Sequence, residues 1–359
     1  MEAGIVLLLR NFGSISKCYC RMGLPLSILD LSPVSSGMTA GQALNNTLEL
    51  AQTAERLGYH RFWLAEHHNM PGVASSSPEI LIGQVARMTS RIRVGSGGVM
   101  LPNHAPLKVA ESFLTLEALF PGRIDLGIGR APGSDPRTAQ ALRRSQGIGS
   151  ELPELLEDLF AFAGGGFPEG HPFQSVSAVP MGVALPPVWL LGSSDYSARV
   201  AGQIGLGFVF AHHINPHGAA VAMQVYRDHW AASGHQTDPQ SIVTTSVICA
   251  DTDAEADVLA SSFDLAWLRL AAGRPSQFPS VAEAQAYRYT VRERMMVKET
   301  RARLIAGSPQ TVRSGICALG GQTGADEVMV TTMVHDHAER LRTYELLAEV
   351  FELDHATGS

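Results

Sequence analysis

Apolar residues along the chain follow two alternating patterns. Short runs rich in Val, Ile and aromatic residues predict strands, whose side chains alternate between two faces. Longer stretches with an apolar residue at every third or fourth position predict helices that bury one face. The strand pattern occurs at residues 26–30, 61–65, 92–100, 124–128, 188–191, 208–211, 242–250 and 327–332.

Helical patterns lie between most of these strands. The most regular one spans 41–58, where apolar residues form one stripe and Gly58 ends the helix. Another begins at Ser77 and Pro78, a serine cap followed by a proline in the first turn. The remaining patterns lie at 107–120, 152–162, 196–204, 219–232 and 337–351.

This alternation predicts an α/β fold, a closed (β/α)8 TIM barrel. An open doubly wound sheet is less favoured, because the first strand-to-helix turn, 33–37, lacks the glycine spacing of such folds. Two long excursions, 134–186 and 252–305, follow strands four and seven. We expect both on the face formed by the carboxyl ends of the strands, where barrel active sites lie.

The predicted domain is one barrel at 24–353, between tails at 1–23 and 354–359. The first clear strand signal follows Leu24, and the apolar run at 5–9 is too short to span a bilayer. That run follows Glu2 and lacks the basic start and small-residue cleavage site of a signal peptide. We therefore expect the N-terminal segment to be a disordered tail.

Composition narrows the partners. The chain has 359 residues, 45% of them hydrophobic, and a formal net charge of −7, so no polybasic surface suggests nucleic acid or an anionic membrane. Its cysteines, Cys18, Cys20, Cys249 and Cys317, show no spacing typical of a metal site. We expect free thiols and a cytoplasmic location.

Polar residues cluster where predicted strands end. They are Glu66, His67 and His68 after strand two, His104 after strand three, and His212 and His213 after strand six. Because the carboxyl ends of the strands meet at one mouth, this clustering favours a functional site there, although a single histidine at a strand end more often has a structural role. A metal hydrolase is the rival interpretation. It is less favoured, because successive residues on a strand face opposite ways and these histidines include no His-x-His pair.

Two further features favour a phosphomonoester site. Arg130 follows strand four, and its planar fork of donors suits a phosphate, with a surface salt bridge as the alternative. Gly192, Ser193 and Ser194 open a predicted helix that contains Ser197. Free backbone N–H groups at a helix start bind anions, and an ordinary cap is the alternative.

Glycines interrupt strand three at 95–98, apart from Ser96. Glycine weakens a strand unless another group must approach its backbone closely. A flat ring lying against this strand would explain the glycines, and a β-bulge is the alternative.

The sequence resembles the bacterial luciferase-like monooxygenase family from about residue 24 to 351. The segments that carry the resemblance are Ala-Glu-His-His at 65–68 and the stretches 94–102, 120–130 and 324–330. The resemblance implies the TIM barrel and a site for reduced FMN at its mouth.

The resemblance also implies roles for matching residues near the flavin ring. His67 would be the active-site base or hydrogen-bonding group, and Glu66 would lie beneath the ring. The bond between Gly97 and Gly98 matches a non-prolyl cis peptide that the family places against the ring. Gly129 stands where luciferase itself has a reactive cysteine, so light emission is not implied.

Other matching residues lie around the rest of the cofactor. The implied cofactor-binding residues beyond the two glycines are Arg130, Gly192, Ser193, Ser194 and Ser197 around the phosphate, with Ala211 and His212 flanking the isoalloxazine. No metal is implied.

The implied activity is that of a two-component flavin-dependent monooxygenase. FMNH2 would come from a separate NAD(P)H:flavin reductase, because the sequence has no nicotinamide fingerprint. With O2 as co-substrate, a C4a-hydroperoxyflavin would oxygenate a small hydrophobic or aromatic organic substrate, with secondary-metabolite tailoring as one such role. The family also suggests a homodimer.

The second excursion carries aromatic residues that form a candidate lid over an apolar pocket, with ordinary surface packing as the alternative. They are Phe263, Trp267, Phe278, Tyr287 and Tyr289. Two other functions stay open on the same fold. One is an oxidoreductase that transfers hydride with the deazaflavin F420, and the other is a non-catalytic flavin-binding protein.

Overall fold

A computed structural model describes residues 24–131, 133–142, 152–231 and 237–353. The predicted tails at 1–23 and 354–359 lie outside the described residues. The parallel strands close into the predicted barrel, because the last strand of the ring pairs with both β1 and β8. In order around the ring, these strands are β1 (Leu26–Asp30), β2 (Arg61–Leu64), β3 (Arg93–Ser96), β5 (Ile124–Gly129), β6 (Val188–Gly192), β7 (Gly207–Ala211), β8 (Ser241–Cys249) and β10 (Glu327–Thr331).

Two short strands add to the ring. The sequence pattern predicted one strand at 92–100, but the structure divides it into β3 and β4 (Val99–Met100), with a cis peptide between Gly97 and Gly98. Both parts pair with β5. β9 (Leu304–Gly307) was not predicted; it pairs with the second half of β8 from Ser246 onward, and Ser246 is also the last β8 residue that pairs with β10.

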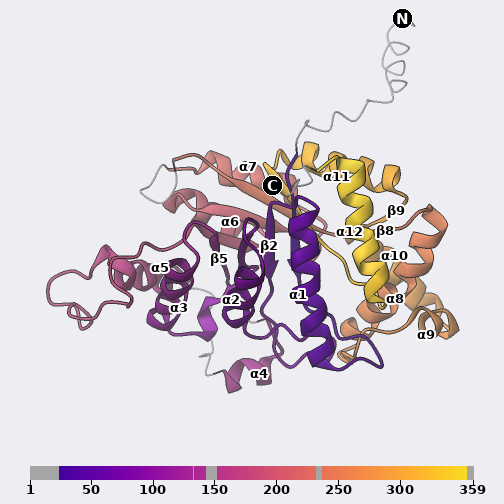
Figure 1. Ribbon diagram of the computed structural model, residues 1–359, viewed down its shortest axis with the longest axis horizontal. Coiled ribbons are helices and arrows are strands. Elements are labelled where there is room, and N and C mark those ends of the chain that lie inside the picture. The colour runs from indigo at the N-terminus through magenta and orange to yellow at the C-terminus, as the bar shows by residue number, and fades with distance from the viewer. Residues whose placement is uncertain (1–23, 132, 143–151, 232–236, 354–359) are drawn as a thin grey trace, which may run out of the picture.

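Helices surround the barrel (Figure 1). Those between successive strands of the ring are α1 (Ala40–Arg56), α2 (Pro78–Met88), α3 (Pro106–Leu119), α6 (Asp195–Ile204), α7 (Ala219–Asp228) and α11 (Pro309–Thr323), and α12 (His337–Phe351) follows the last strand. The sequence pattern did not predict α11, because glycines within it weaken the helical pattern. Ser77 precedes α2 as predicted, but its side chain makes no capping hydrogen bond.

The two excursions contain helices of their own. The first has α4 (Pro136–Ala141), which the pattern did not predict, and α5 (Leu152–Phe160), which it did. The second has α8 (Asp253–Ala271), α9 (Val281–Ala286) and α10 (Val291–Thr300) before β9. α8 begins at a capping box, in which Thr252 and Glu255 each accept a hydrogen bond from the other's backbone N–H.

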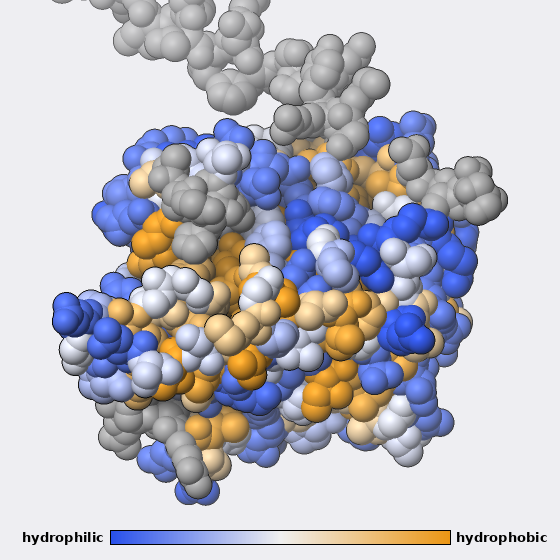
Figure 2. Space-filling view, turned by 60° about the vertical axis from the view of Figure 1, so that its left-hand side comes forward, coloured by the Kyte–Doolittle hydropathy of each residue, from blue (hydrophilic) through white to orange (hydrophobic). Residues whose placement is uncertain are grey.

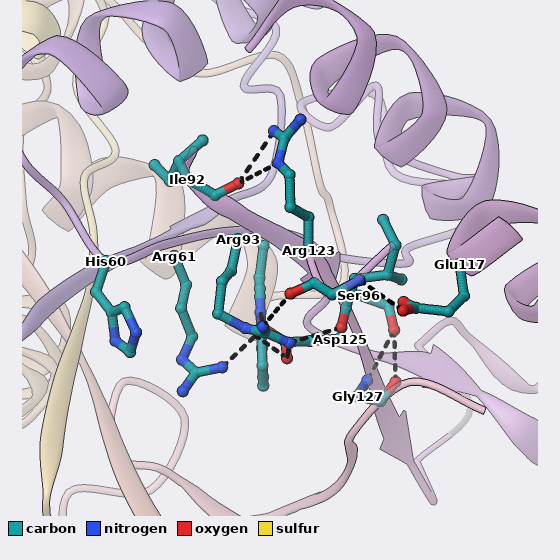
Figure 3. Close-up of polar contacts among 12 residues, drawn as sticks. His60, Arg61, Ile92, Arg93, Ser96, Glu117, Arg123, Asp125 and Gly127 are labelled. Carbon is teal, nitrogen blue, oxygen red and sulfur yellow. Dashed lines mark hydrogen bonds and ion pairs between the residues drawn. The ribbon is translucent and has the colours of Figure 1, made fainter. Parts of the chain in front are cut away.

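Charged side chains close the amino end of the barrel interior (Figure 3). Arg61, at the start of β2, donates to Asp125 of β5 at 2.8 Å and to Glu327 of β10 at 3.0 Å. Arg93 and the indole N–H of Trp63 also donate to Asp125, so this buried carboxylate is fully hydrogen-bonded. The arginines hold the pKa of Asp125 low although burial alone would raise it.

An apolar layer lies above this network. Leu29, Trp63, Trp189, Val209 and Met329 form one buried cluster, in which the two tryptophan rings meet edge to face at 5.8 Å. This cluster fills the barrel, so any ligand must bind at its carboxyl end.

The two cysteines of the described residues differ in their bonding. Cys249 is a buried free thiol, as expected. Cys317 is bonded in a disulfide, so the expectation of a free thiol is wrong for that residue. None of the helices in the described ranges is long and apolar enough to cross a membrane.

One face of the molecule carries exposed apolar side chains. Figure 2 shows hydrophobic atoms gathered across the middle of this face, between hydrophilic areas. The exposed apolar residues of the protein include Leu119 at the end of α3, and Phe173, Val179 and Met181 in the stretch before β6.

Candidate active site

Glu66 follows β2 and is buried at the mouth of the barrel. Its carboxylate accepts hydrogen bonds from Nε2 of His68 at 2.8 Å, from Nε2 of His104 at 2.9 Å and from the backbone N–H of Met100 at 2.9 Å. Burial alone would raise the pKa of Glu66, but these donors lower it overall. The carboxylate is therefore ionised and joins the end of β2 to β4 and the loop before α3.

The same contacts act on His104. The hydrogen bond that it donates to Glu66 raises the pKa of His104, which favours its charged form. Sequence analysis placed His104 at a strand end but gave it no role. The sequence does not predict the hydrogen bond between Glu66 and His104, because only the closed barrel brings their two loops together.

His67 is half-buried beside this group. Its Nδ1 lies 3.3 Å from the carbonyl oxygen of Gly133, so Nδ1 is the donor and Nε2 is left as an acceptor. Burial lowers the pKa of His67 below its usual range. The imidazole is therefore neutral near pH 7 and able to accept a proton.

His213, which the sequence pattern placed at the end of a strand without assigning it a role, lies near His67. Its backbone N–H and its Nδ1 both donate to the carbonyl of Thr244, at 3.0 and 3.3 Å. Burial lowers the pKa of His213 to about 4, with smaller effects from His67 and His212. His212 itself contacts the hydroxyl of Thr245 at 3.2 Å, and burial lowers its pKa too. The mouth thus contains three imidazoles that are neutral at neutral pH.

The two glycines of the cis peptide pack tightly on the barrel wall. A Cβ atom at Gly97 would lie 2.4 Å from Leu29, and one at Gly98 would lie 2.7 Å from the carbonyl oxygen of Gly127. Close packing therefore requires glycine at both positions, whether or not a ring lies against them. The bond between them is cis, as the family resemblance implied.

Met100 fills the space beside Gly129. A Cβ atom at Gly129 would lie 2.6 Å from the sulfur of Met100, whose strand pairs with β5 at this point. The departure from luciferase at Gly129 thus has a local structural reason, because the Met100 thioether takes the room of a side chain there. Sequence analysis did not foresee this, since the two positions are far apart in the chain.

The predicted phosphate residues lie at the ends of β5 and β6. The guanidinium of Arg130 stacks 4.5 Å above the ring of Tyr196 in the first turn of α6. Ser194 is the N-cap of that helix and makes no side-chain capping hydrogen bond. Ser197 is buried, and a Cβ atom at Gly192 would lie 2.6 Å from its side chain, so glycine lets the helix start pack against β6.

The remaining predicted residues lie at the ends of β6 and β7, and an Asn joins these ends. The carbonyl of Ser193 accepts a hydrogen bond from the side chain of Asn215 at 2.9 Å. Ala211 is the last residue of β7, and its carbonyl accepts the N–H groups of Ile214 and Asn215. The predicted cofactor-binding residues therefore come from the neighbouring strands β3, β5, β6 and β7, and the histidines of β2 and β7 flank them.

The aromatic residues of the second excursion divide into two groups. Phe263 and Phe278 are buried in an apolar cluster with Ile248 and Val334, which is ordinary packing. Trp267 is half-buried and carries the guanidinium of Arg303 at 4.6 Å from its ring. Tyr287 and Tyr289 contact each other edge-on. Only the residues outside the cluster remain available to a lid.

The described part of the chain contains no group of three His, Cys, Asp or Glu side chains arranged to hold a metal ion. The donors at the mouth are instead an arginine, an open helix start and neutral imidazoles. This donor set suits an organic cofactor with a phosphate.

The family model of the luciferase-like monooxygenases matches residues 24–327. The chain belongs to this family. A luciferase-like monooxygenase of Escherichia coli K12 is 41% identical over 330 residues, which is 92% of this chain and 97% of the relative. The N-acetyl-S-alkylcysteine monooxygenase of Bacillus subtilis strain 168 is 36% identical over 325 residues, which is 90% of this chain and 97% of the relative.

Solved structures of other proteins share the barrel. Apo-MsnO8 has a TM-score of 0.85 at 40% identity and covers 92% of this chain and 99% of its own. Two more distant chains agree in fold alone, each covering 91% of this chain and 97% of its own. The oxygenating constituent of 3,6-diketocamphane monooxygenase from Pseudomonas putida, in complex with FMN, has a TM-score of 0.69 at 22% identity. The F420-dependent tetrahydromethanopterin reductase of Methanopyrus kandleri has a TM-score of 0.64 at 18% identity. The fold therefore occurs with both cofactors.

Proposed function

We propose that this luciferase-like protein is a two-component monooxygenase that takes FMNH2 from a separate NAD(P)H:flavin reductase and uses O2 to oxygenate a small hydrophobic organic substrate. The observation that carries the proposal is the arrangement at the mouth. Arg130 and the open start of α6 lie on one side, and the neutral imidazole of His67 lies beyond the glycine strand. A phosphate and a ring that reacts with oxygen need these two kinds of surroundings.

The chain's own residues fit FMN. Arg130, Gly192, Ser193, Ser194 and Ser197 would hold the phosphate, because a planar cation and free N–H groups favour a dianion. The ring would lie between the backbone at Gly97 and Gly98 and the residues Ala211 and His212. When bound in its reduced form, FMN would supply the electrons that activate dioxygen.

Two side chains would have distinct tasks in this reaction. His67 would accept or return a proton at Nε2, which its bond to Gly133 leaves available. Glu66 has no proton to donate, because its carboxylate is ionised, and its oxygens already accept four hydrogen bonds. It would act as a positioning residue that holds Met100 and the glycine strand in register with the histidines.

Exclusion of water would fall to the second excursion. Its α8 packs against β8 and β9, and Arg303, which lies over Trp267 of α8, donates to the carbonyl of Ile214 in the loop after β7 at 2.9 Å. A dry site prevents loss of the oxidising equivalent to water. The exposed apolar face in Figure 2 would pair with a second copy in the homodimer that the family suggests.

Anaerobic titration with FMNH2, followed by mixing with oxygenated buffer, tests this function. We expect saturable binding and reoxidation that is slower than that of free FMNH2, with delayed release of hydrogen peroxide. His67→Ala should bind FMNH2 but release peroxide about 100-fold faster, since general acid–base residues contribute factors of this size.

His229→Ala is the matched control, because His229 also donates from Nδ1 to a backbone carbonyl, that of Val225 at the end of α7. It should behave as the wild type. Absence of FMNH2 binding, or reoxidation at the rate of free flavin, would exclude the proposal. Binding of reduced F420 with hydride transfer would then support the alternative on the same fold.

A further inference from the structure

Arg303 stands at the junction between the second excursion and β9, and it lies beside the mouth. Its Nη1 donates to the carbonyl of Ile214, in the loop after β7. Its guanidinium plane rests on Trp267 of α8. These two contacts fix the position of the cation without neutralising it.

No carboxylate of the described residues pairs with Arg303. Its Nε is buried and has no hydrogen-bond partner there, and Nη1 makes its one hydrogen bond to a neutral carbonyl. Burial lowers the pKa of Arg303, and no acidic group in the described part of the chain opposes that effect. A half-buried cation without a counter-charge is costly unless a ligand supplies one.

A neighbouring arginine shows the carboxylate pairing that Arg303 lacks among the described residues. Arg301, two residues earlier, donates from Nε and Nη2 to the two oxygens of Asp264, at 2.6 and 2.7 Å. This side-on pairing is the bidentate geometry by which arginine recognises carboxylates. In Arg303 the Nη1 is used, and the same Nε and Nη2 edge is left for a partner.

The surroundings of this edge are mixed in character. His212 and His213 lie close enough for the charge of Arg303 to lower their pKa values slightly, after the larger effect of burial. Trp267 is half-buried and Ile214 is 51% exposed. A ligand here would meet one cation, neutral imidazoles and apolar surface.

We propose that Arg303 and Trp267 form a subsite for a carboxylate on the organic substrate, whose apolar part lies against Trp267 and Ile214. The inference rests on the proposed function, because it gives the substrate of that site an anionic group. The expected class of substrate changes from any small hydrophobic molecule to one that carries a carboxylate at one end.

The test compares two pairs of molecules that differ only in charge at one end, phenylacetate with phenylacetamide and octanoate with octanamide. Isothermal titration calorimetry would measure their binding to the full chain, both without added flavin and saturated with oxidised FMN. We expect at least one acid to bind about tenfold more tightly than its amide, as one good charged pair predicts. Arg303→Gln should abolish this preference, and Arg303→Lys should keep part of it.

Arg313→Gln is the matched control. Arg313, on α11, also lies over an aromatic ring, with its guanidinium 5.9 Å from the ring of Phe351 on α12. It should keep the preference for the acid. Equal binding of acid and amide by the wild type, a preference that survives in Arg303→Gln, or no binding of either pair up to about 10 mM would each overturn the subsite.

A second experiment tests whether Arg303 binds a carboxylate of the substrate or the phosphate of the cofactor. Arg303→Gln should bind FMNH2 and reduced riboflavin with the same affinities as the wild type. If it weakens FMNH2 selectively, the cation serves the cofactor phosphate and the carboxylate subsite is wrong. If the wild type prefers the acids but fails to bind FMNH2, the subsite stands and the proposed function falls.

Discussion

The two ends of the barrel use charged residues in opposite ways. At the amino end, Arg61 and Arg93 both donate to Asp125, whose carboxylate is fully hydrogen-bonded (Figure 3). Arg61 also donates to Glu327. At the carboxyl end, Arg303 lacks an acidic partner among the described residues, and His67 keeps Nε2 available. Charged groups that pair with one another stabilise the fold but have no free donor or acceptor for a ligand. Groups at the mouth that keep a free donor or acceptor can bind a ligand and take part in a reaction.

The largest expected effect comes from breaking the amino-end network. Asp125→Leu leaves the buried Arg61, the half-buried Arg93 and the Trp63 indole without this acceptor, so the free energy of unfolding should fall by about 3–5 kcal/mol. Chemical denaturation measures this loss. Asp251→Asn, whose side chain is 65% exposed in its pair with Arg342, should cost less than about 1 kcal/mol. Equal losses in the two variants would refute the contrast between buried and exposed pairs.

The next effect concerns pH at the carboxyl end. The folded protein lowers the pKa of His213 to about 4 from the usual 6.5, so the unfolded chain binds the proton more readily. Stability is therefore retained above pH 6.5 and is lost as the pH falls from there towards 4, by up to about 3 kcal/mol.

Denaturation curves at several pH values check this dependence. In His213→Asn, whose amide can still donate to Thr244, the slope of stability against pH should become shallower. The remaining slope belongs to His67 and His212, whose pKa values are also lowered. An unchanged slope would mean that His213 does not carry the effect.

A smaller effect is expected at the predicted phosphate site. Arg130→Met keeps an apolar stem over Tyr196 but removes the cation. FMNH2 should bind about 10- to 100-fold more weakly, while reduced riboflavin, which has no phosphate, should bind as before. Fluorescence or absorbance titration under anaerobic conditions measures both. Equal weakening for both flavins would place Arg130 outside a phosphate site.

The smallest effect compares two glycines of β5. An alanine Cβ at Gly127 would lie 2.0 Å from the carbonyl of Ser96, which the barrel wall fixes, whereas at Gly129 it would meet the flexible end of Met100 at 2.6 Å. Gly127→Ala should therefore lose about 1–2 kcal/mol more stability than Gly129→Ala. Similar losses would show that the mouth is as rigid as the interior.

Much of the fold was predictable from local patterns. Each strand of the closed ring has the short apolar run that a buried parallel strand requires, and the predicted strands overlap the observed ones. The failures have physical causes. α11 is rich in glycine and small residues, and the break at Gly97 and Gly98 lies inside an apolar run that looked continuous.

The candidate site was partly predictable. His67 and Arg130 follow strands, and barrel geometry alone places such residues at one mouth. Arg303 gave no signal, because an arginine in a charged helical stretch looks like many others. That no described acidic residue pairs with it becomes visible only when its neighbours in space are known.

The sequence by itself determined the order of strands and helices and the positions of the strand ends, because periodic burial is a local property of the chain. Only the tertiary structure decided which charges neutralise one another. Glu66 accepts a hydrogen bond from His104, and Asp125 accepts one from Arg61. In each pair the two residues are far apart in the sequence, and no motif connects them. Pairing, burial and the resulting pKa values depend on distances in space, and these exist only once the barrel has closed.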